Sequence, residues 1–203
     1  MHRIRGPMSG RGRRRPSDRP GAPGVSAPLA PPVLLVHGLW TNRAVMLYLA
    51  HRLAAAGFAP RSVGYLSALR DFAHNAARVG RMIAETPGPS VHIVAHSLGG
   101  LVTLAALAHA PDERVRRVVL LGVPIADSLS GALIARSRLA PLLGTTRALW
   151  LSHPRPDIPA DVEAGAIAGT RRFGLGRVVL DLPPPNDGVV TVAETRHASV
   201  RTG

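Results

Sequence analysis

Short, continuous apolar runs alternate along the chain with longer segments in which apolar residues recur every three or four positions. Residues 33–36 read Val-Leu-Leu-Val, residues 91–95 read Val-His-Ile-Val-Ala, and residues 115–121 are again mostly Val and Leu. Runs of this length and kind are typical of strands buried on both faces of a sheet. We expect further strands at residues 61–65 and 164–168, and one at 177–180 inside a loop rich in Gly and Pro.

Segments with helical periodicity separate these strands. One helix is expected to start at Thr41 or Asn42 and to end at Gly57, and an apolar helix is expected from Ser97 to about Ala110. The apolar stripe of a further helix is formed by Leu69, Phe72, Ala76, Val79 and Ile83. The alternation of strands and helices predicts an α/β fold, with a mainly parallel sheet flanked by helices on both faces.

The composition changes sharply near residue 31. Residues 1–31 contain seven arginines, several prolines and glycines, and no apolar period, so we expect a disordered basic tail. Residues 32–203 are expected to form one domain. Within it, residues 125–160 are expected to mix helical pieces and loops.

Composition and charge exclude several classes of function. The chain has no cysteine, which excludes thiol catalysis and zinc–thiolate sites. Its formal net charge is +13, and all 25 basic residues are arginine. Because no zinc-finger spacing, helix-turn-helix or aromatic platform accompanies this charge, we expect no nucleic-acid partner. No apolar run is long enough for a transmembrane segment and no signal peptide is visible, so the expected location is cytoplasmic.

The strongest chemical signal is the sequence Ala95-His96-Ser97-Leu98-Gly99 between a predicted strand and a predicted helix. It fits the nucleophile elbow G-x-S-x-G with alanine in the first glycine position. Small residues two before and two after the serine let the strand and helix approach, while the serine adopts a strained backbone conformation. The pattern predicts Ser97 as a nucleophile, whereas His96 should point away from it; an ordinary βα turn with a chance serine is the alternative.

A second short motif follows the first buried strand. His37 and Gly38 lie where this architecture supplies a backbone N–H to an oxyanion hole, and Gly38 would let the chain turn so that the Leu39 amide faces the site. The second N–H would come from Leu98, the residue after the serine. The alternative is that His37 and Gly38 merely end a strand.

With these motifs the chain resembles the α/β-hydrolase superfamily, specifically its small bacterial lipase- and esterase-like serine hydrolases. The matching segments fall within residues 32–196 and are residues 36–39, 94–100, 118–124 and 186–190. The apolar character of residues 125–160 favours an acyl or lipid-like substrate, although plain helix packing is the alternative. The resemblance places a substrate-covering cap at these residues and implies hydrolysis of carboxylic esters through an acyl-enzyme. It implies no metal or organic cofactor. It does not fix the substrate, because the same fold hosts thioesterases, amidases, haloperoxidases and transferases.

A serine nucleophile also needs a histidine base and a carboxylate that orients the base, in the chain order Ser, acid, His. The resemblance places the acid at Asp187, although an Asn-Asp-Gly sequence also favours a plain turn. Weaker alternatives for the acid are Asp157, Asp161 and Asp181.

Only His197 follows Asp187, by ten residues, without the strand that relatives insert between acid and base. Three interpretations stay open. His197 is catalytic through a shortened return, or the fold is incomplete at its C-terminus and the true histidine is missing, or the protein is a non-catalytic relative. The first two interpretations correspond to a serine esterase, and the third corresponds to a binding or scaffold protein. An acyltransferase using the same elbow, and a protein that binds RNA or lipid through its tail, are further alternatives.

Overall fold

The structure is a computed structural model that describes residues 30–126, 128–151, 155–172 and 182–202. The tail expected at residues 1–31, apart from its last two residues, and the strand expected at 177–180 lie outside the described residues.

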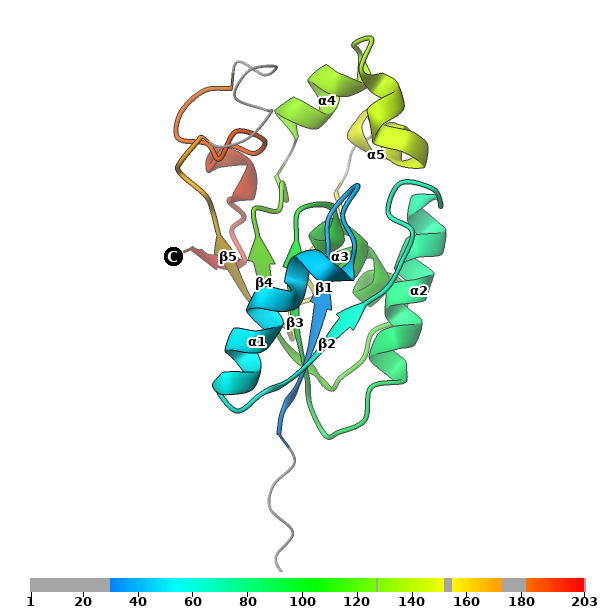
Figure 1. Ribbon diagram of the computed structural model, residues 1–203, viewed down its shortest axis with the longest axis vertical. Helices are drawn as coiled ribbons and strands as arrows, with labels where there is room; N and C mark the ends of the chain where they lie inside the picture. The colour runs from blue at the N-terminus through cyan, green and yellow to red at the C-terminus, as the bar shows by residue number, and fades with distance from the viewer. Residues whose placement is uncertain (1–29, 127, 152–154, 173–181, 203) are drawn as a thin grey trace, which may run out of the picture.

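A six-stranded parallel sheet, in the order β2-β1-β3-β4-β5-β6, forms the centre of the described domain (Figure 1). All five neighbouring pairs are parallel, which confirms the predicted fold class. The strands are β1 (Pro32–Val36), β2 (Ala59–Val63), β3 (Val91–His96), β4 (Val115–Leu121), β5 (Glu163–Ile167) and β6 (Val200–Thr202). Because every strand runs in the same direction, their carboxyl ends meet at one edge of the sheet.

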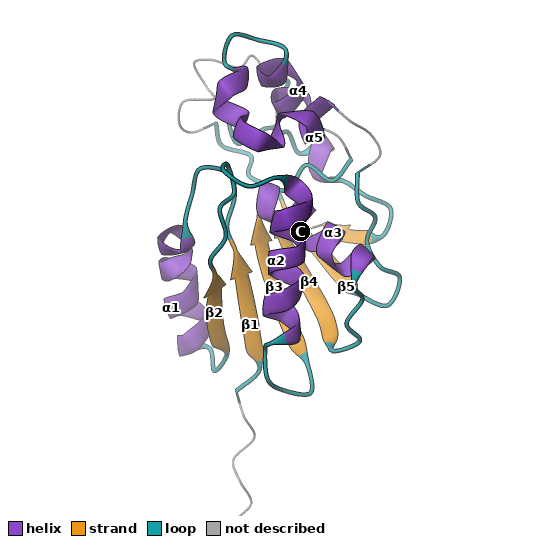
Figure 2. Cartoon of the chain, turned by 90° about the vertical axis from the view of Figure 1, so that its right-hand side faces the viewer, coloured by secondary structure: helices purple, strands orange, loops and turns teal. Residues whose placement is uncertain are grey.

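Helices cover the sheet from both sides (Figure 2). On one face, helix α1 (Leu47–Ala55), preceded by the 3-10 turn η1 (Arg43–Met46), packs Leu49 and Leu53 against Val33 and Leu35 of β1. On the other face, α2 (Phe72–Ala84) and α3 (Leu98–His109) bury their apolar sides against the larger core. The alternating side chains of β1 therefore face two separate cores, as expected for a strand buried on both sides.

Three details differ from the sequence-based expectation. Strand β2 begins at Ala59, two residues early, because Pro60 can occupy an edge strand that needs no N–H on its outer side. Leu69 is 67% exposed and lies before α2, since Asp71 starts that helix by accepting the His74 N–H at 2.7 Å. Strand β6 was not expected at all.

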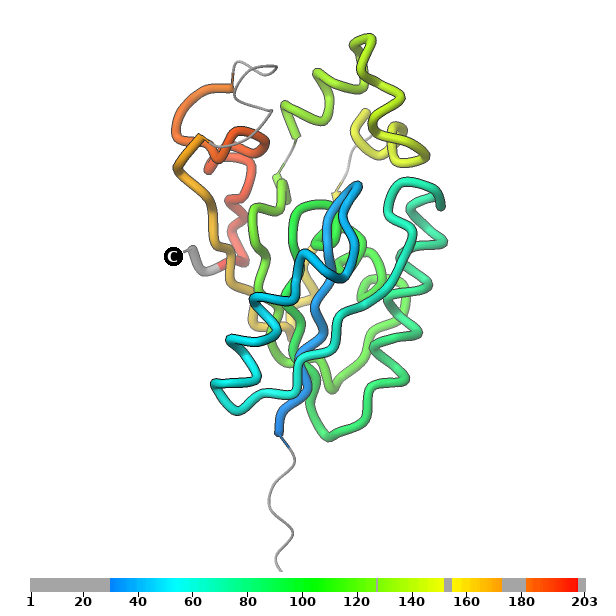
Figure 3. Tube along the Cα trace, viewed as in Figure 1, coloured from blue at the N-terminus to red at the C-terminus, as the bar shows by residue number. Residues whose placement is uncertain are grey.

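Residues 128–151, which we call the cap, lie beyond the carboxyl ends of the strands (Figures 1 and 3). The cap contains α4 (Leu129–Ala135), the 3-10 segment η2 (Ala140–Thr146) and α5 (Arg147–Leu151). Several hydrogen bonds hold it over the sheet, including those of Leu129 and Thr145. The Leu129 N–H donates to the Glu194 carboxylate at 2.5 Å, and the Thr145 N–H donates to the Ala68 carbonyl at 3.2 Å. Glu194 belongs to the 3-10 turn η3 (Ala193–Thr195) that precedes β6.

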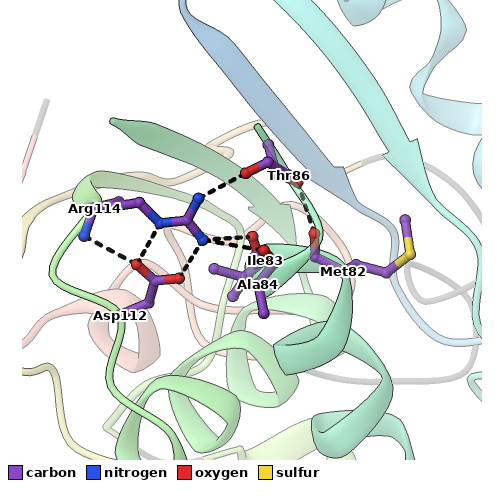
Figure 4. A network of polar contacts seen from close by, with 6 residues as sticks. All are labelled: Met82, Ile83, Ala84, Thr86, Asp112 and Arg114. Carbon is purple, nitrogen blue, oxygen red and sulfur yellow. Dashed lines mark hydrogen bonds and ion pairs between the residues drawn. The ribbon is translucent and has the colours of Figure 1, made fainter. Parts of the chain in front are cut away.

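At the amino ends of the strands, Arg114 lies just before β4 and connects this turn to the end of α2 (Figure 4). Its guanidinium pairs with Asp112 at 2.7 Å and donates to the Thr86 carbonyl at 2.7 Å, just after α2. A cation at a helix C-terminus also interacts favourably with the helix dipole. These contacts tie the turn before β4 to the end of α2, on the side of the sheet away from Ser97.

Candidate active site

Ser97 occupies the turn between β3 and α3 with φ 51° and ψ −126°. A positive φ is unfavourable for any residue with a Cβ, so this is a strained backbone position of the kind that concentrates at functional sites. The Ser97 N–H donates to the Leu121 carbonyl at 3.0 Å, which fixes the turn beside the end of β4. The strand-to-helix turn predicted at Ser97 is therefore present.

Close backbone approaches explain the glycines around this turn. A Cβ on Gly99 would lie 2.4 Å from the His37 carbonyl oxygen and 2.7 Å from that of Val36, so only glycine lets α3 start against the end of β1. A Cβ on Gly38 would lie 3.1 Å from both Ser97 Cβ and His96 Nδ1. Gly38 therefore lies close to Ser97, and the positive φ of this loop, 56°, belongs to Trp40.

The loop after β1 is held rigidly next to Ser97. The Thr41 hydroxyl donates to the Gly38 carbonyl at 2.9 Å, and the Tyr65 hydroxyl donates to the His37 carbonyl. Burial raises the pKa of the Tyr65 hydroxyl, which therefore keeps its proton and remains a donor. Sequence analysis missed Tyr65, because nothing in its position at the end of a short strand indicated a partner 28 residues away.

The two residues expected to supply oxyanion-hole amides, Leu39 and Leu98, come from the loop after β1 and from the start of α3. Leu98 is the first residue of α3, and the first N–H groups of a helix have no partner within the helix. Leu39 lines the same cavity as Ser97. Two amides near the positive end of a twelve-residue helix would suit a developing negative charge.

Asp187 lies between the carboxyl ends of β4 and β5. Its Oδ2 is 3.4 Å from the place of a Cβ on Gly122, and its own Cβ is 2.7 Å from the place of a Cβ on Gly169. Its Oδ1 accepts the N–H groups of Val189 at 2.8 Å and Val190 at 2.7 Å. The carboxylate is therefore fixed in orientation, one strand away from Ser97.

A cavity of about 510 Å³ brings these groups together. Ser97, Asp187 and His96 line it, and the cap forms the opposite wall. The lining of the whole cavity is largely apolar, and its apolar side chains are Leu39, Trp40, Pro124, Ile134, Leu143, Trp150, Val189 and Val190. A larger hollow of about 680 Å³ lies between α2 and α3, but the described residues that line it are mostly alanine and include no serine or carboxylate. The smaller cavity is the one with groups able to do chemistry.

His96 lines this cavity, whereas the sequence had suggested that it points away from Ser97. Its Nδ1 is buried and has no hydrogen-bond partner among the residues that the structure describes. Burial lowers the pKa of His96, and the negative charge of Asp187 opposes this effect. Burial thus favours the neutral form of the imidazole in the cavity that Ser97 and Asp187 also line.

Comparison with known proteins bears directly on this arrangement. Residues 33–201 match the model of the alpha/beta hydrolase family. The chain belongs to this family. None of the curated protein sequences is significantly similar to it.

Several solved structures resemble this α/β hydrolase. The mature lipase BlEst2 of Bacillus licheniformis superimposes with a TM-score of 0.68 at 25% identity, over 87% of this chain and 83% of the lipase. The metagenomic carboxyl esterase MGS0156 has a TM-score of 0.64 at 20% identity, over 94% and 67% of the two chains. The esterase EaEST of Exiguobacterium antarcticum has a TM-score of 0.57 at 17% identity, over 86% and 82%. The last two likenesses show the fold alone.

The structure corrects the expectation for His197. Val200 in β6 pairs with Ala164 in β5, so His197 precedes β6 on the amino side of the sheet, while Ser97 lies at the carboxyl edge. His197 Nε2 is 3.8 Å from Asp157 Oδ1, a carboxylate that is 94% exposed. Strand β6 thus follows His197 instead of lying between Asp187 and His197. His197 is therefore not brought to the cavity of this α/β hydrolase.

The alternatives for the acid are also separated from Ser97. Asp157 is paired with His197, and Asp161 precedes β5 on the amino side of the sheet. Asp181 lies outside the described residues. Across the parts of the chain that the structure describes, no three His, Asp or Glu side chains gather to hold a metal ion, and no helix has the length and apolarity to cross a membrane.

Proposed function

We propose that this α/β hydrolase cleaves carboxylic esters through an acyl-enzyme on Ser97, with Asp187 as the triad acid. The observation that carries the proposal is the strained turn of Ser97, at the edge of a cavity that Asp187 also lines. The 25% identity to a bacterial lipase over most of both chains supports the ester as the substrate class.

In this mechanism the Ser97 hydroxyl attacks the ester carbonyl carbon while a neutral imidazole accepts its proton. The amides of Leu39 and Leu98 hold the oxyanion, and loss of one such donor costs about 3 kcal/mol of transition-state stabilisation. The imidazolium then protonates the departing alcohol, which leaves the acyl group on Ser97. Water repeats the sequence and releases the carboxylic acid, and no cofactor enters these steps.

The imidazole is the remaining group to assign. His96 lines the cavity with a buried, unpartnered Nδ1, whereas His197 lies on the far side of the sheet. His96 is therefore the first base to test, with His197 as its comparison. The apolar wall formed by Ile134, Leu143 and Trp150 suits the hydrocarbon part of an acyl ester.

The test is covalent labelling with a fluorophosphonate followed by turnover of short-chain nitrophenyl esters. We expect wild-type protein to be labelled at Ser97, S97A to be neither labelled nor active, and S130A to behave as wild type. Ser130 is the matched control because it is a serine of the same cavity wall, on α4. Labelling of S97A equal to wild type would remove Ser97 as the nucleophile.

A further inference from the structure

The leucines of helix α4 lie on its outward side, while its buried positions are the small residues Ser130, Gly131 and Ala135. Leu129 and Leu133 are 42% and 46% exposed, whereas Ser130 and Gly131 are buried. The usual surface helix has the opposite pattern, with its apolar stripe facing the core. Packing within the domain does not explain leucines on the solvent side of α4.

The apolar surface continues beyond α4. Leu142 in η2 is 53% exposed and Leu151 in α5 is 42% exposed. Leu66 and Leu69, 53% and 67% exposed, flank Ala68, whose carbonyl accepts the N–H of Thr145 in the cap. Single exposed leucines are ordinary, but several gathered at one end of a domain indicate a binding surface.

This surface carries positive charge. Residues 128–151 include Arg136, Arg138 and Arg147, all exposed, and no Asp or Glu. Among the described residues, the Glu194 carboxylate binds the cap, but it is buried and already accepts the N–H groups of Leu129 and Thr191. The outer side of the cap therefore combines leucines with uncompensated arginines.

We propose that the outer side of the cap, together with Leu66 and Leu69, binds the surface of an anionic lipid bilayer. Leucines that enter the interfacial zone and arginines that meet lipid phosphates are the two contributions that hold a protein on such a surface. The described helices are too short to cross a membrane, so the cap lies on the bilayer. A second copy of the chain fits less well, because two arginine-bearing caps would repel each other. This surface is independent of the chemistry at Ser97.

The experiment measures partition of the full chain onto vesicles of phosphatidylcholine with or without 30% phosphatidylglycerol, at two salt concentrations. Trp40, 60% exposed and hydrogen-bonded to the Leu142 carbonyl, reports contact through its fluorescence. We expect binding only to the anionic vesicles, weakened by salt. L133S/L142S should lower the partition coefficient at least about tenfold. R136Q/R138Q should lower the partition coefficient about fivefold for each arginine removed.

Matched variants separate the cap from the arginines of residues 1–31, which are present in every protein compared. Leu47 and Tyr48 on α1 are 61% and 72% exposed, and Arg81 and Arg116 are exposed away from the cap. L47S/Y48S and R81Q/R116Q should bind vesicles as wild type does. The proposal would be overturned if the chain bound both kinds of vesicle equally, or if the cap and control variants lost binding to the same extent. Self-association through the cap in the absence of lipid would also overturn it. Fluorophosphonate labelling of Ser97, measured without vesicles, tests the proposed esterase function separately from vesicle binding.

Discussion

The Tyr65 hydroxyl donates a hydrogen bond to the His37 carbonyl, and the rings of these two residues stack with centroids 4.4 Å apart. His37 directly precedes Gly38 and Leu39, so this contact fixes the loop whose Leu39 amide we assign to the oxyanion hole. We expect Y65F to lower kcat about tenfold with little change in KM, because the loop would position its amide less well only in the transition state. Steady-state kinetics on a nitrophenyl ester measures both constants.

Y65F also leaves the buried His37 carbonyl without its hydroxyl partner, which should cost about 1–3 kcal/mol of unfolding free energy. Tyr48 provides the control, because it is 72% exposed and its hydroxyl only accepts a hydrogen bond from Arg52 on the same helix. Y48F should keep wild-type kinetics and stability. A Y65F protein with unchanged kcat would show that the loop does not depend on this clamp.

A methyl group on Gly99 should be poorly tolerated. The Cβ would lie 2.4 Å from the His37 carbonyl oxygen, so α3 and β1 would have to separate at the turn that presents Ser97. We expect G99A to lose about 1–3 kcal/mol of unfolding free energy and most of its activity. G80A is the comparison, since a Cβ there meets only the Ala106 side chain at 3.9 Å within a helix. The G80A variant should be as stable as wild type or about 1 kcal/mol more stable. Equal effects of G99A and G80A on chemical denaturation would refute the steric argument.

The fixed carboxylate of Asp187 leads to a third prediction. Asparagine keeps the size of the side chain but loses the charge that would orient and stabilise a protonated base, so D187N should reduce kcat about ten-thousandfold. D157N removes the carboxylate beside His197 and should leave turnover unchanged. If D157N proved the more damaging substitution, the acid would have been assigned to the wrong edge of the sheet.

Much of this architecture could be predicted because the decisive signals are local. Each buried run is a strand in the structure, and the small residues around Ser97 encode the turn by themselves. Asp71 shows how one capping side chain moved a helix start past Leu69, against the apolar stripe. Such boundaries depend on a competition between capping and periodicity that the stripe does not reveal.

The placement of the histidines could not be predicted, because it depends on contacts between strands far apart in the chain. Chain order made His197 the obvious base, but the pairing of Val200 with Ala164 puts it on the amino side of the sheet. His96 was expected to point away from Ser97, and neighbouring side chains on a strand do point to opposite faces. The turn at Ser97 ends that alternation, so both residues line one cavity.

This placement can be checked by a pair of substitutions. We expect H197Q to keep wild-type labelling at Ser97 and wild-type ester turnover, because the His197 ring contacts Asp157 on the far side of the sheet. H96Q should slow both reactions at least about a hundredfold if His96 receives the serine proton. A large loss in H197Q would restore the assignment based on chain order, and a loss in neither would exclude both histidines as the base.

The buried histidines should also make stability depend on pH. Burial holds the pKa of His37 and of His96 below the ordinary value of 6.5 in the folded protein. Between that lowered value and 6.5 the unfolded chain binds more protons than the folded one, so the free energy of unfolding is greatest above pH 6.5 and falls as the pH drops through this window. Urea denaturation at pH 7.5 and 5.5 would measure the difference. H96Q should reduce it, because its side chain cannot take up a proton, while H51Q, at an exposed position of α1, should retain the wild-type difference. A protein more stable at the lower pH would contradict the inferred neutral state of these two rings.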